Sequence, residues 1–430
     1  MQFTFKRLLS VLFILFSAPL FAQEQGLDFR INEAFTPIAN WWGAVVLHNF
    51  PGTEIPTIIF LLVGGALFFT VYFGFINVKR FPTAINTVRG KYDEVDDHSN
   101  DVEEGEVSHF QALATAVSGT VGNGNIAGVA LAIAIGGPGA TFWMILCGLI
   151  GMSTKFVECT LGVKYRDVGE DGTVYGGPMY YLTKGLEEKG FARLGKTLAV
   201  IFAVLCIGAS FGGGNAAQSN QAAMQLVESF GMTGGNARTI IGLIMMAVVG
   251  IIIIGGIKRI AQVTEKVVPL MALMYILACL YIIITNNTFV DDAFGMIFSQ
   301  AFNPQAGLGG LLGVLITGFR RAAFSNEAGA GSASIAHSAV KTKYAASEGM
   351  VALLEPFIDT VVVCTMTALV LIITGNVTSA NAGLNDAQAI LLTSGAFESA
   401  ISWFPYVLTV AVVLFAFSTM ISWSYYGFQG

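Results

Sequence analysis

Long stretches of apolar residues without a single charge set the pattern of this chain. A helix that spans a bilayer needs about 18 to 20 apolar residues in succession. Five stretches reach that length, and each is continuous, unlike the short alternating segments of an outer-membrane barrel. The pattern therefore predicts an all-α polytopic membrane protein. The five charge-free stretches are residues 55–78, 197–227, 239–257, 267–290 and 399–430.

Apolar segments that contain a few polar residues add further spans, which brings the predicted number to nine. Between them, the acidic stretch 93–106 and the segment 166–195 are expected to be solvated loops on one side of the membrane. The predicted spans are residues 55–78, 107–136, 139–164, 197–230, 238–257, 266–287, 305–339, 348–375 and 399–427.

The amino terminus has the pattern of a secretory signal peptide. Basic residues precede an apolar stretch at 8–16, and cleavage is expected after Ala22. An uncleaved first anchor is the alternative, because the residue three positions before that cleavage point is not small. We expect residues 1–22 to be removed, residues 23–54 to form a periplasmic segment, and residues 55–430 to form the membrane domain.

The distribution of Lys and Arg agrees with an amino terminus outside the membrane. Basic residues collect in the cytoplasmic loops of membrane proteins. If the amino terminus is outside, the loops predicted to be inside hold most of the basic residues, whereas the outside segments 286–305 and 375–398 hold none. The sequence therefore predicts a multi-pass protein whose mature amino terminus is outside.

Composition excludes a water-soluble protein and several functional classes. Hydrophobic residues make up 54% of the 430 residues and charged residues 12%, against about 25% charged in soluble proteins. The net charge is −6 and no basic cluster suggests nucleic-acid binding. The five cysteines stand singly in apolar runs, and neither an HExxH pattern nor a GxSxG-type nucleophile elbow between a strand and a helix is indicated. We therefore expect no enzyme activity, and no obligatory protein partner is indicated.

Two of the predicted spans are interrupted by glycine and polar residues. The first contains SGTVGNGNIAG at 118–128 and the second contains FSNEAGAGS at 324–332. Backbone that leaves the helix inside a membrane is tolerated only where it lines a cavity. Half-helix amino termini favour a carboxylate, and exposed carbonyls favour a cation. Close helix packing through glycine is the alternative, but it does not require Asn, Ser, Thr and Glu at the same depth.

The position of the two interrupted spans indicates an inverted repeat. If 107–136 is the first core helix, the second interrupted span, 305–339, is the sixth. Interrupted helices in corresponding positions of two halves are typical of secondary transporters. The sequence thus predicts two repeats of five helices, with 55–78 as an extra leading helix.

Five motifs resemble the alanine or glycine:cation symporter family, the bacterial sodium:alanine symporters, over residues 55–430. They are GTVGNGNIAGVA at 119–130, GGPGATFWM at 136–144, YGGPMYY at 175–181, FSNEAGAGSASIAH at 324–337 and FSTMISWSYYG at 417–427. The resemblance implies a LeuT-like fold in a bacterial inner membrane. It also implies sodium-coupled import of alanine or glycine by alternating access.

Comparison with that family also marks differences. The family commonly has Thr where this chain has Asn123, which bears on substrate preference, and Trp where it has Ile145. Members of the family continue with further helices after the last motif. We therefore expect the reading frame to continue beyond Gly430 for at least two more spans, so that the chain as given is truncated after the eighth core helix.

The resemblance implies two sodium sites made of oxygen ligands. The first lies between the first and eighth core helices and uses the carbonyls of Ser118 and Val121 with the hydroxyls of Ser418 and Thr419. The alternative for these two hydroxyls is bonding within their own helix. The second site would use Thr120, Asn125 and Ser325.

The substrate is expected at the first interruption. Backbone N–H groups of Gly122, Asn123 and Gly124 would bind it, together with the amide of Gln218. Thr419 and Trp423 lie one helical turn apart on one face. We expect Trp423 to close a pocket small enough for a methyl side chain, and the alternative is an interfacial tryptophan.

Charged residues in or near the spans are expected to form a structural or gating network, with a proton relay as the alternative. Lys155 and Glu158 are three residues apart and could neutralise each other. We expect Glu355 and Asp359 to pair with the arginines of the sixth core helix, Arg320 and Arg321. Proton coupling through Glu327, Glu355 or Asp359 is the alternative to sodium coupling.

Overall fold

The computed structural model describes residues 27–53, 55–92, 105–232, 236–303 and 310–430. The predicted signal peptide, residues 1–22, and most of the acidic stretch lie outside the described residues. The chain forms two compact units, Met1–Ile58 and Ile59–Gly430. In the first unit, α2 (Leu27–Val46) precedes an antiparallel bridge between Asn49 and Pro56.

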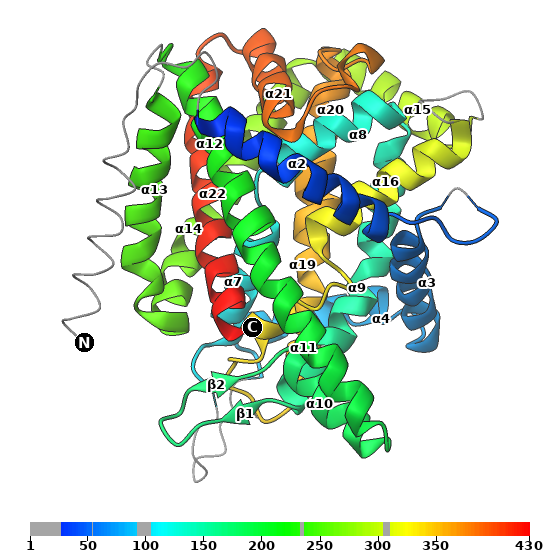
Figure 1. Ribbon diagram of the computed structural model, residues 1–430. Helices are drawn as coiled ribbons and strands as arrows, with labels where there is room; N and C mark the ends of the chain where they lie inside the picture. Colours follow the sequence, from blue (N-terminus) through cyan, green and yellow to red (C-terminus); the bar gives the residue numbers. More distant parts are fainter. Residues whose placement is uncertain (1–26, 54, 93–104, 233–235, 304–309) are drawn as a thin grey trace. The chain divides into compact units, whose positions relative to one another are not determined.

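The rest of the described chain is a set of helices with one two-stranded hairpin (Figure 1). Its first part contains α3 (Thr57–Tyr72), α4 (Ile76–Lys79), α5 (Phe81–Val88), α7 (His109–Thr120), η1 (Gly124–Gly128), α8 (Val129–Gly136), α9 (Ala140–Lys164), β1 (Asp167–Val168), β2 (Val174–Tyr175), α10 (Pro178–Glu188), α11 (Ala192–Ala209), η2 (Ser210–Ala216), α12 (Ala217–Ser229), α13 (Ala237–Ile253) and α14 (Gly256–Thr285). Its second part contains η3 (Asn287–Phe289), α15 (Val290–Ala301), α16 (Gly310–Asn326), α17 (Ala333–His337), α18 (Ala345–Ala352), α19 (Leu354–Pro356), η4 (Phe357–Cys364), α20 (Thr365–Thr374), η5 (Ser379–Asn381), α21 (Asp386–Ala400) and α22 (Phe404–Gln429).

Helices long and apolar enough to cross a membrane account for six of the nine predicted spans. In the described residues five meet the test on their own, and the bent pair formed by α7 and η1–α8 is a sixth. The other three predicted spans correspond to α3, α13 and α16, which are only 16, 17 and 17 residues long. The protein is thus an all-α membrane protein with multiple spans.

Several segments expected to be loops are partly helical. The segment 166–195 holds the β1–β2 hairpin and α10, and the outside segments hold α15 and α21. Lys258 and Arg259, expected in a loop, lie in the first turn of α14 instead. A capping box between Asn385 and Gln388 begins α21. Short helices of this kind lack the long apolar run on which the span prediction depends.

Both predicted interruptions are present. The bent pair turns by 53° between α7 and η1–α8, and η1 has the wider π-helical winding, which recurs at functional sites. The second interruption separates α16 from α17, and Glu327 within it has a φ of 54°. A left-handed conformation is costly for a residue with a side chain, so the surrounding structure must hold it. Two further π-helical segments, η2 and η4, were not expected.

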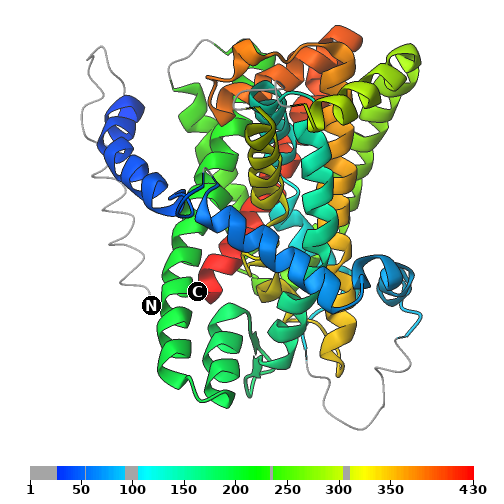
Figure 2. The same ribbon diagram turned by 90° about the vertical axis from the view of Figure 1, so that its right-hand side faces the viewer.

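Helix α9 packs closely against the second interrupted segment and α18. Small residues make these approaches possible. A Cβ on Gly162 would lie 2.8 Å from the carbonyl oxygen of Ser334, and one on Gly349 would lie 2.0 Å from the hydroxyl of Thr160. Figure 1 shows α22 in red alongside α12 and α13, and Figure 2 shows the same ribbon turned by 90°. Helix α22 also contacts α7 and α14, so it borders the first interruption.

Candidate functional site

Side chains replace the backbone hydrogen bonds that α7 loses at its break. The N–H of Gly122 donates to Oδ1 of Asn125 at 2.9 Å, not to the carbonyl of Ser118 one turn earlier. The N–H of Asn123 donates to Oε1 of Gln218 at 3.2 Å. Two of the three N–H groups expected to bind a ligand are therefore engaged within the protein. Because the N–H of Gly122 bonds to Asn125, the carbonyl of Ser118 does not receive the hydrogen bond that a regular helix would give it.

Four of the predicted ligand-binding residues nevertheless come together. A Cβ on Gly122 would lie 2.6 Å from Oγ1 of Thr419 and 3.2 Å from Oε1 of Gln218. The backbone of α7 therefore approaches α12 and α22 more closely than any larger residue would permit. Asn123 and Thr419 are 0% and 2% exposed. Neither Nδ2 nor Oδ1 of Asn123, nor Oγ1 of Thr419, has a hydrogen-bond partner among the described residues.

Unpaired polar atoms at this depth are costly, at about 1–3 kcal/mol for each group. Native proteins keep few of them. The three unpaired atoms of Asn123 and Thr419 next to the break could therefore form hydrogen bonds with a polar ligand. Gly124, the remaining residue of the predicted set, begins η1 and is partly exposed, and the nearest side-chain atom to its would-be Cβ is Cε1 of Phe324 at 3.9 Å.

Trp423 lies beside the break. Its Nε1 donates to the carbonyl of Gly119 at 3.2 Å, and a Cβ on Gly214 would lie 2.4 Å from the Cβ of Trp423. The indole also meets Tyr426 edge to face, with ring centroids 5.4 Å apart. These contacts place Trp423 between α7 and η2, and its role as a pocket wall stays a prediction.

The residues of the first predicted sodium site make different contacts in the structure. The hydroxyl of Ser418 donates to the carbonyl of Phe415 at 3.0 Å and lies 3.4 Å from Sδ of Met271 on α14. This is the bonding within its own helix that stood as the alternative. Ser118 instead contacts Ser422, one turn further along α22. Val121 is fully buried at the end of α7.

Two residues of the second predicted site meet around a carboxylate that was not assigned to it. Nδ2 of Asn125 donates to Oδ1 of Asp359 at 2.6 Å and to Oγ of Ser325 at 3.1 Å. Ser325 and Thr360 donate to the other oxygen of Asp359, at 2.8 and 2.7 Å. Thr120, in contrast, bonds only to carbonyls of its own helix. Asp359, which had been expected to pair with the arginines of the sixth core helix, therefore bonds to these neutral groups.

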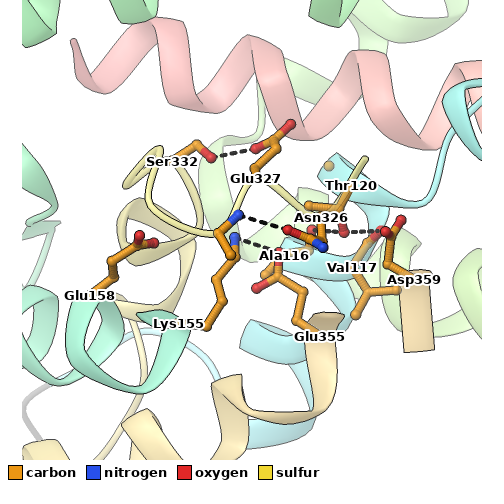
Figure 3. A network of polar contacts seen from close by, with 12 residues as sticks. Ala116, Val117, Thr120, Lys155, Glu158, Asn326, Glu327, Ser332, Glu355 and Asp359 are labelled. Atoms are coloured by element: carbon orange, nitrogen blue, oxygen red, sulfur yellow. Dashed lines mark hydrogen bonds and ion pairs between the residues drawn. The ribbon is translucent and has the colours of Figure 1, made fainter. Parts of the chain in front are cut away.

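A buried ion pair connects α9 with α19. Figure 3 shows Lys155 and Glu355 pointing toward each other, and Nζ lies 3.0 Å from Oε1. The expected pairing of Glu355 with arginine is replaced by this pair, and Lys155 also interacts electrostatically with Glu158, as expected. Glu158 accepts a hydrogen bond from the N–H of Gly329 in the second interruption. Glu327, in the same segment, accepts one from Ser332 (Figure 3).

The ion pair extends through two histidines to the start of α7. His337 Nε2 lies 3.8 Å from Glu355, and Nδ1 of His337 bonds to Glu348. The second oxygen of Glu348 bonds to Nδ1 of His109. All of these side chains are at least 93% buried, with His109 the most exposed at 7%. The network links both interrupted helices with α9, α18 and α19.

Sequence reasoning missed Ser422, Tyr426 and the role of Asp359. Ser422 and Tyr426 lie three and seven residues after Thr419 and so share its helix face, which was a usable signal. Nothing in the sequence indicated that Lys155 would meet a residue 200 positions away.

The chain matches known proteins over most of its length. A family described as the sodium:alanine symporter family matches residues 43–430. The sodium/alanine symporter AgcS of Methanococcus maripaludis is 43% identical over 373 residues, which cover 86% of this chain and 79% of that protein. The amino-acid carrier protein AlsT of Bacillus subtilis is 37% identical, covering 89% and 77%. The probable sodium/glutamine symporter GlnT of Bacillus subtilis is 35% identical, covering 86% and 73%.

The Lys155–Glu355 pair predicts a strong asymmetry between single and double substitutions. Glu355→Gln should lower the unfolding free energy by about 3–5 kcal/mol because it leaves a buried lysine without its counterion. The double substitution Lys155→Met/Glu355→Met should recover most of that loss. Thermal unfolding of the purified protein measures both. Asp167→Asn serves as the control, since its pair with Lys184 is exposed and is worth less than about 1 kcal/mol. Equal losses in the single and double variants would contradict the assignment.

Proposed function

Because the chain belongs to the sodium:alanine symporter family, whose match extends over residues 43–430, we propose that it is a sodium-coupled symporter that imports alanine or glycine by alternating access. Membership of the family makes it a cation-coupled amino-acid transporter of the membrane and not an enzyme. The choice of sodium and of small neutral substrates is the proposal, and the geometry of the first break supports it.

The observation that carries the proposal is the unpaired amide of Asn123. An amide offers a donor and an acceptor together, which match the carboxylate and the ammonium group of a zwitterionic amino acid. The hydroxyl of Thr419, also unpaired, adds a group that can donate or accept. The substrate would thus satisfy three atoms that have no partner in the described part of the chain. Gly124 and the exchangeable bond between Gln218 and Asn123 complete the proposed substrate site.

The size of the site favours a small side chain. Gly122 leaves no room beside Thr419, and Trp423 presses against Gly214. We assign Trp423 to the wall that limits the substrate to a hydrogen or methyl side chain. Because the family commonly has Thr in place of Asn123, this residue is the one that we expect to adjust the preference between alanine and glycine.

For the coupling ion we keep the sodium ligands that the sequence predicted around the break. The Ser418 hydroxyl gives its proton to Phe415, so its lone pairs can still face sodium, together with the carbonyls of Ser118 and Val121 and the hydroxyl of Thr419. A second sodium would lie near Asn125 and Ser325, with Thr120 at the edge. Oxygen ligands of this kind suit a hard cation.

Proton coupling is the second candidate, and one observation favours it. The carboxylate of Asp359 is 0% exposed and accepts hydrogen bonds from the neutral side chains of Asn125, Ser325 and Thr360. Burial disfavours the charged form of a carboxylate, so this group is the one that could carry a coupled proton. Sodium dependence of uptake separates the two candidates.

The proposed location is a bacterial inner membrane, with a cleaved signal peptide and the mature amino terminus outside. The concentration of Lys and Arg in one set of loops supports this orientation. The amino-terminal end of α7 would then face the cytoplasm.

The first prediction tests the ion. Labelled alanine and glycine should enter proteoliposomes of the protein only with an inward sodium gradient. Ser418→Ala/Thr419→Ala should raise the half-saturating sodium concentration about tenfold or more, since hydrogen-bond-type contacts to a charge are worth about 1.5–3 kcal/mol. Ser424→Ala, which removes a hydroxyl that bonds within its own helix, is the control. Unchanged sodium dependence in the double variant would remove these ligands from the proposal.

The second prediction tests the pocket wall. Trp423→Ala should admit larger neutral amino acids and weaken uptake of glycine and alanine, because the indole fills the space beside Gly119. Competition by unlabelled amino acids against labelled alanine measures the change. Trp403→Ala is the matched control, since Trp403 stands at the other end of α22 and is 61% exposed. Wild-type selectivity in Trp423→Ala would show that the indole does not bound the site.

A further inference from the structure

One face of α22 carries three hydroxyls that point at α7. Thr419, Ser422 and Tyr426 follow the i, i+3, i+7 spacing of a single helix face and are 2%, 0% and 1% exposed. We call them the hydroxyl ladder. Oγ1 of Thr419 and the OH of Tyr426 have no hydrogen-bond partner within the described chain. A Cβ on Gly119 would lie 3.1 Å from the hydroxyl oxygen of Tyr426, so the ladder lies directly against the backbone of α7.

The middle of the ladder contains more oxygen contacts than protons. The hydroxyls of Ser118 and Ser422 both donate to the carbonyl oxygen of Thr115, at 2.9 and 3.0 Å. The same two hydroxyl oxygens also contact each other. Each hydroxyl has one proton, so three oxygen pairs share two protons. One pair therefore brings lone pairs together, in a place where all three residues are 0% exposed.

A monovalent cation would relieve this arrangement. Lone pairs that face one another without a proton repel, and a low dielectric strengthens the repulsion. The same oxygens would attract a hard cation. Helix packing through hydroxyl hydrogen bonds is the competing explanation. Such packing requires one proton for each oxygen pair, and this cluster has one proton too few. Packing also does not explain why the hydroxyls of Thr419 and Tyr426, on either side, have no partner within the described chain.

Further oxygens continue from this point toward the amino-terminal end of α7. Oγ1 of Thr115 lies 3.1 Å from Oγ1 of Thr264 on α14. One residue further along α14, the partly exposed Glu265 accepts a hydrogen bond from Gln111 at 2.9 Å. A cation that left the break along this interface would meet oxygen at each turn and a carboxylate at the end.

We propose that the α7–α22 interface holds a second position for a sodium ion, formed by the carbonyl of Thr115 and the hydroxyls of Ser118 and Ser422, through which the coupling ion leaves toward Glu265. This position is distinct both from the ion site at Ser418 and Thr419 and from the sodium proposed near Asn125 and Ser325, and it rests on the proposed sodium coupling. It assigns a function to Ser422, which the substrate site does not use.

The test measures the melting temperature of the purified full chain in sodium chloride against equal choline chloride. A ligand that binds only the folded state raises that temperature with its concentration. Ser418→Ala/Thr419→Ala should retain part of the sodium-dependent rise. Adding Ser422→Ala should lower the remaining sodium affinity about tenfold or more, whereas adding Ser424→Ala should leave it unchanged. If the Ser422→Ala protein does not fold, Ser118→Ala removes the other hydroxyl and serves the same purpose.

The outcomes distinguish this inference from the proposed function. A rise that persists unchanged after Ser422→Ala, or no remaining rise in the double variant while the wild type shows sodium-driven uptake, overturns the second position alone. Absence of both sodium-driven uptake and sodium-dependent stabilisation in the wild type overturns the second position together with sodium coupling.

Discussion

Inside a bilayer the backbone has no water to bond with, and every hydrogen bond that a helix gives up must be replaced by the protein. The break in α7 meets this requirement with side chains. Asn125 and Gln218 take the N–H groups of Gly122 and Asn123, and Asn125 is itself fixed by Asp359 and Ser325. The break is therefore stabilised by side chains of α12 on one side and of α16 and η4 on the other. The unpaired groups of Asn123 and Thr419 remain available because the backbone does not need them.

The buried charges tie the two interrupted helices to one another. Glu348 receives a histidine from the start of α7 and a histidine from α17, and His337 leads on to Glu355 and Lys155. Backbone bonds add to this connection, because the N–H of Glu106 donates to Ala339 and that of Lys341 to Val107. A movement of the first half-helix must therefore break buried polar contacts or carry α17 and α18 with it. Alternating access through movement of one group of helices against another has this physical requirement.

The sequence predicted most of what depends on local pattern. Continuous apolar runs identified the long helices α14 and α22, and the cluster of Gly, Asn and Thr located the break in α7. The structure brings Gly122, Gln218 and Thr419 close together, while their role in substrate binding stays a prediction. The errors concern contacts between distant residues and rotation about a helix axis. Lys155 and Glu355 are separated by 200 positions in the sequence. Ser418 and Thr419 are consecutive residues of α22 and therefore point in different directions, Ser418 toward Met271 and Thr419 toward Gly122. The π-helical η4, in the ordinary sequence FIDTVVVC, has no compositional signal.

The central claim is that the break in α7 is the substrate site and that the unpaired amide of Asn123 is its recognition group. An experimental structure of the protein with sodium and alanine tests this claim most directly. The account predicts density for alanine within hydrogen-bonding distance of the Asn123 amide and the Thr419 hydroxyl, with Trp423 against its methyl group. Alanine bound elsewhere, with the Asn123 amide paired to another part of the protein, would contradict it.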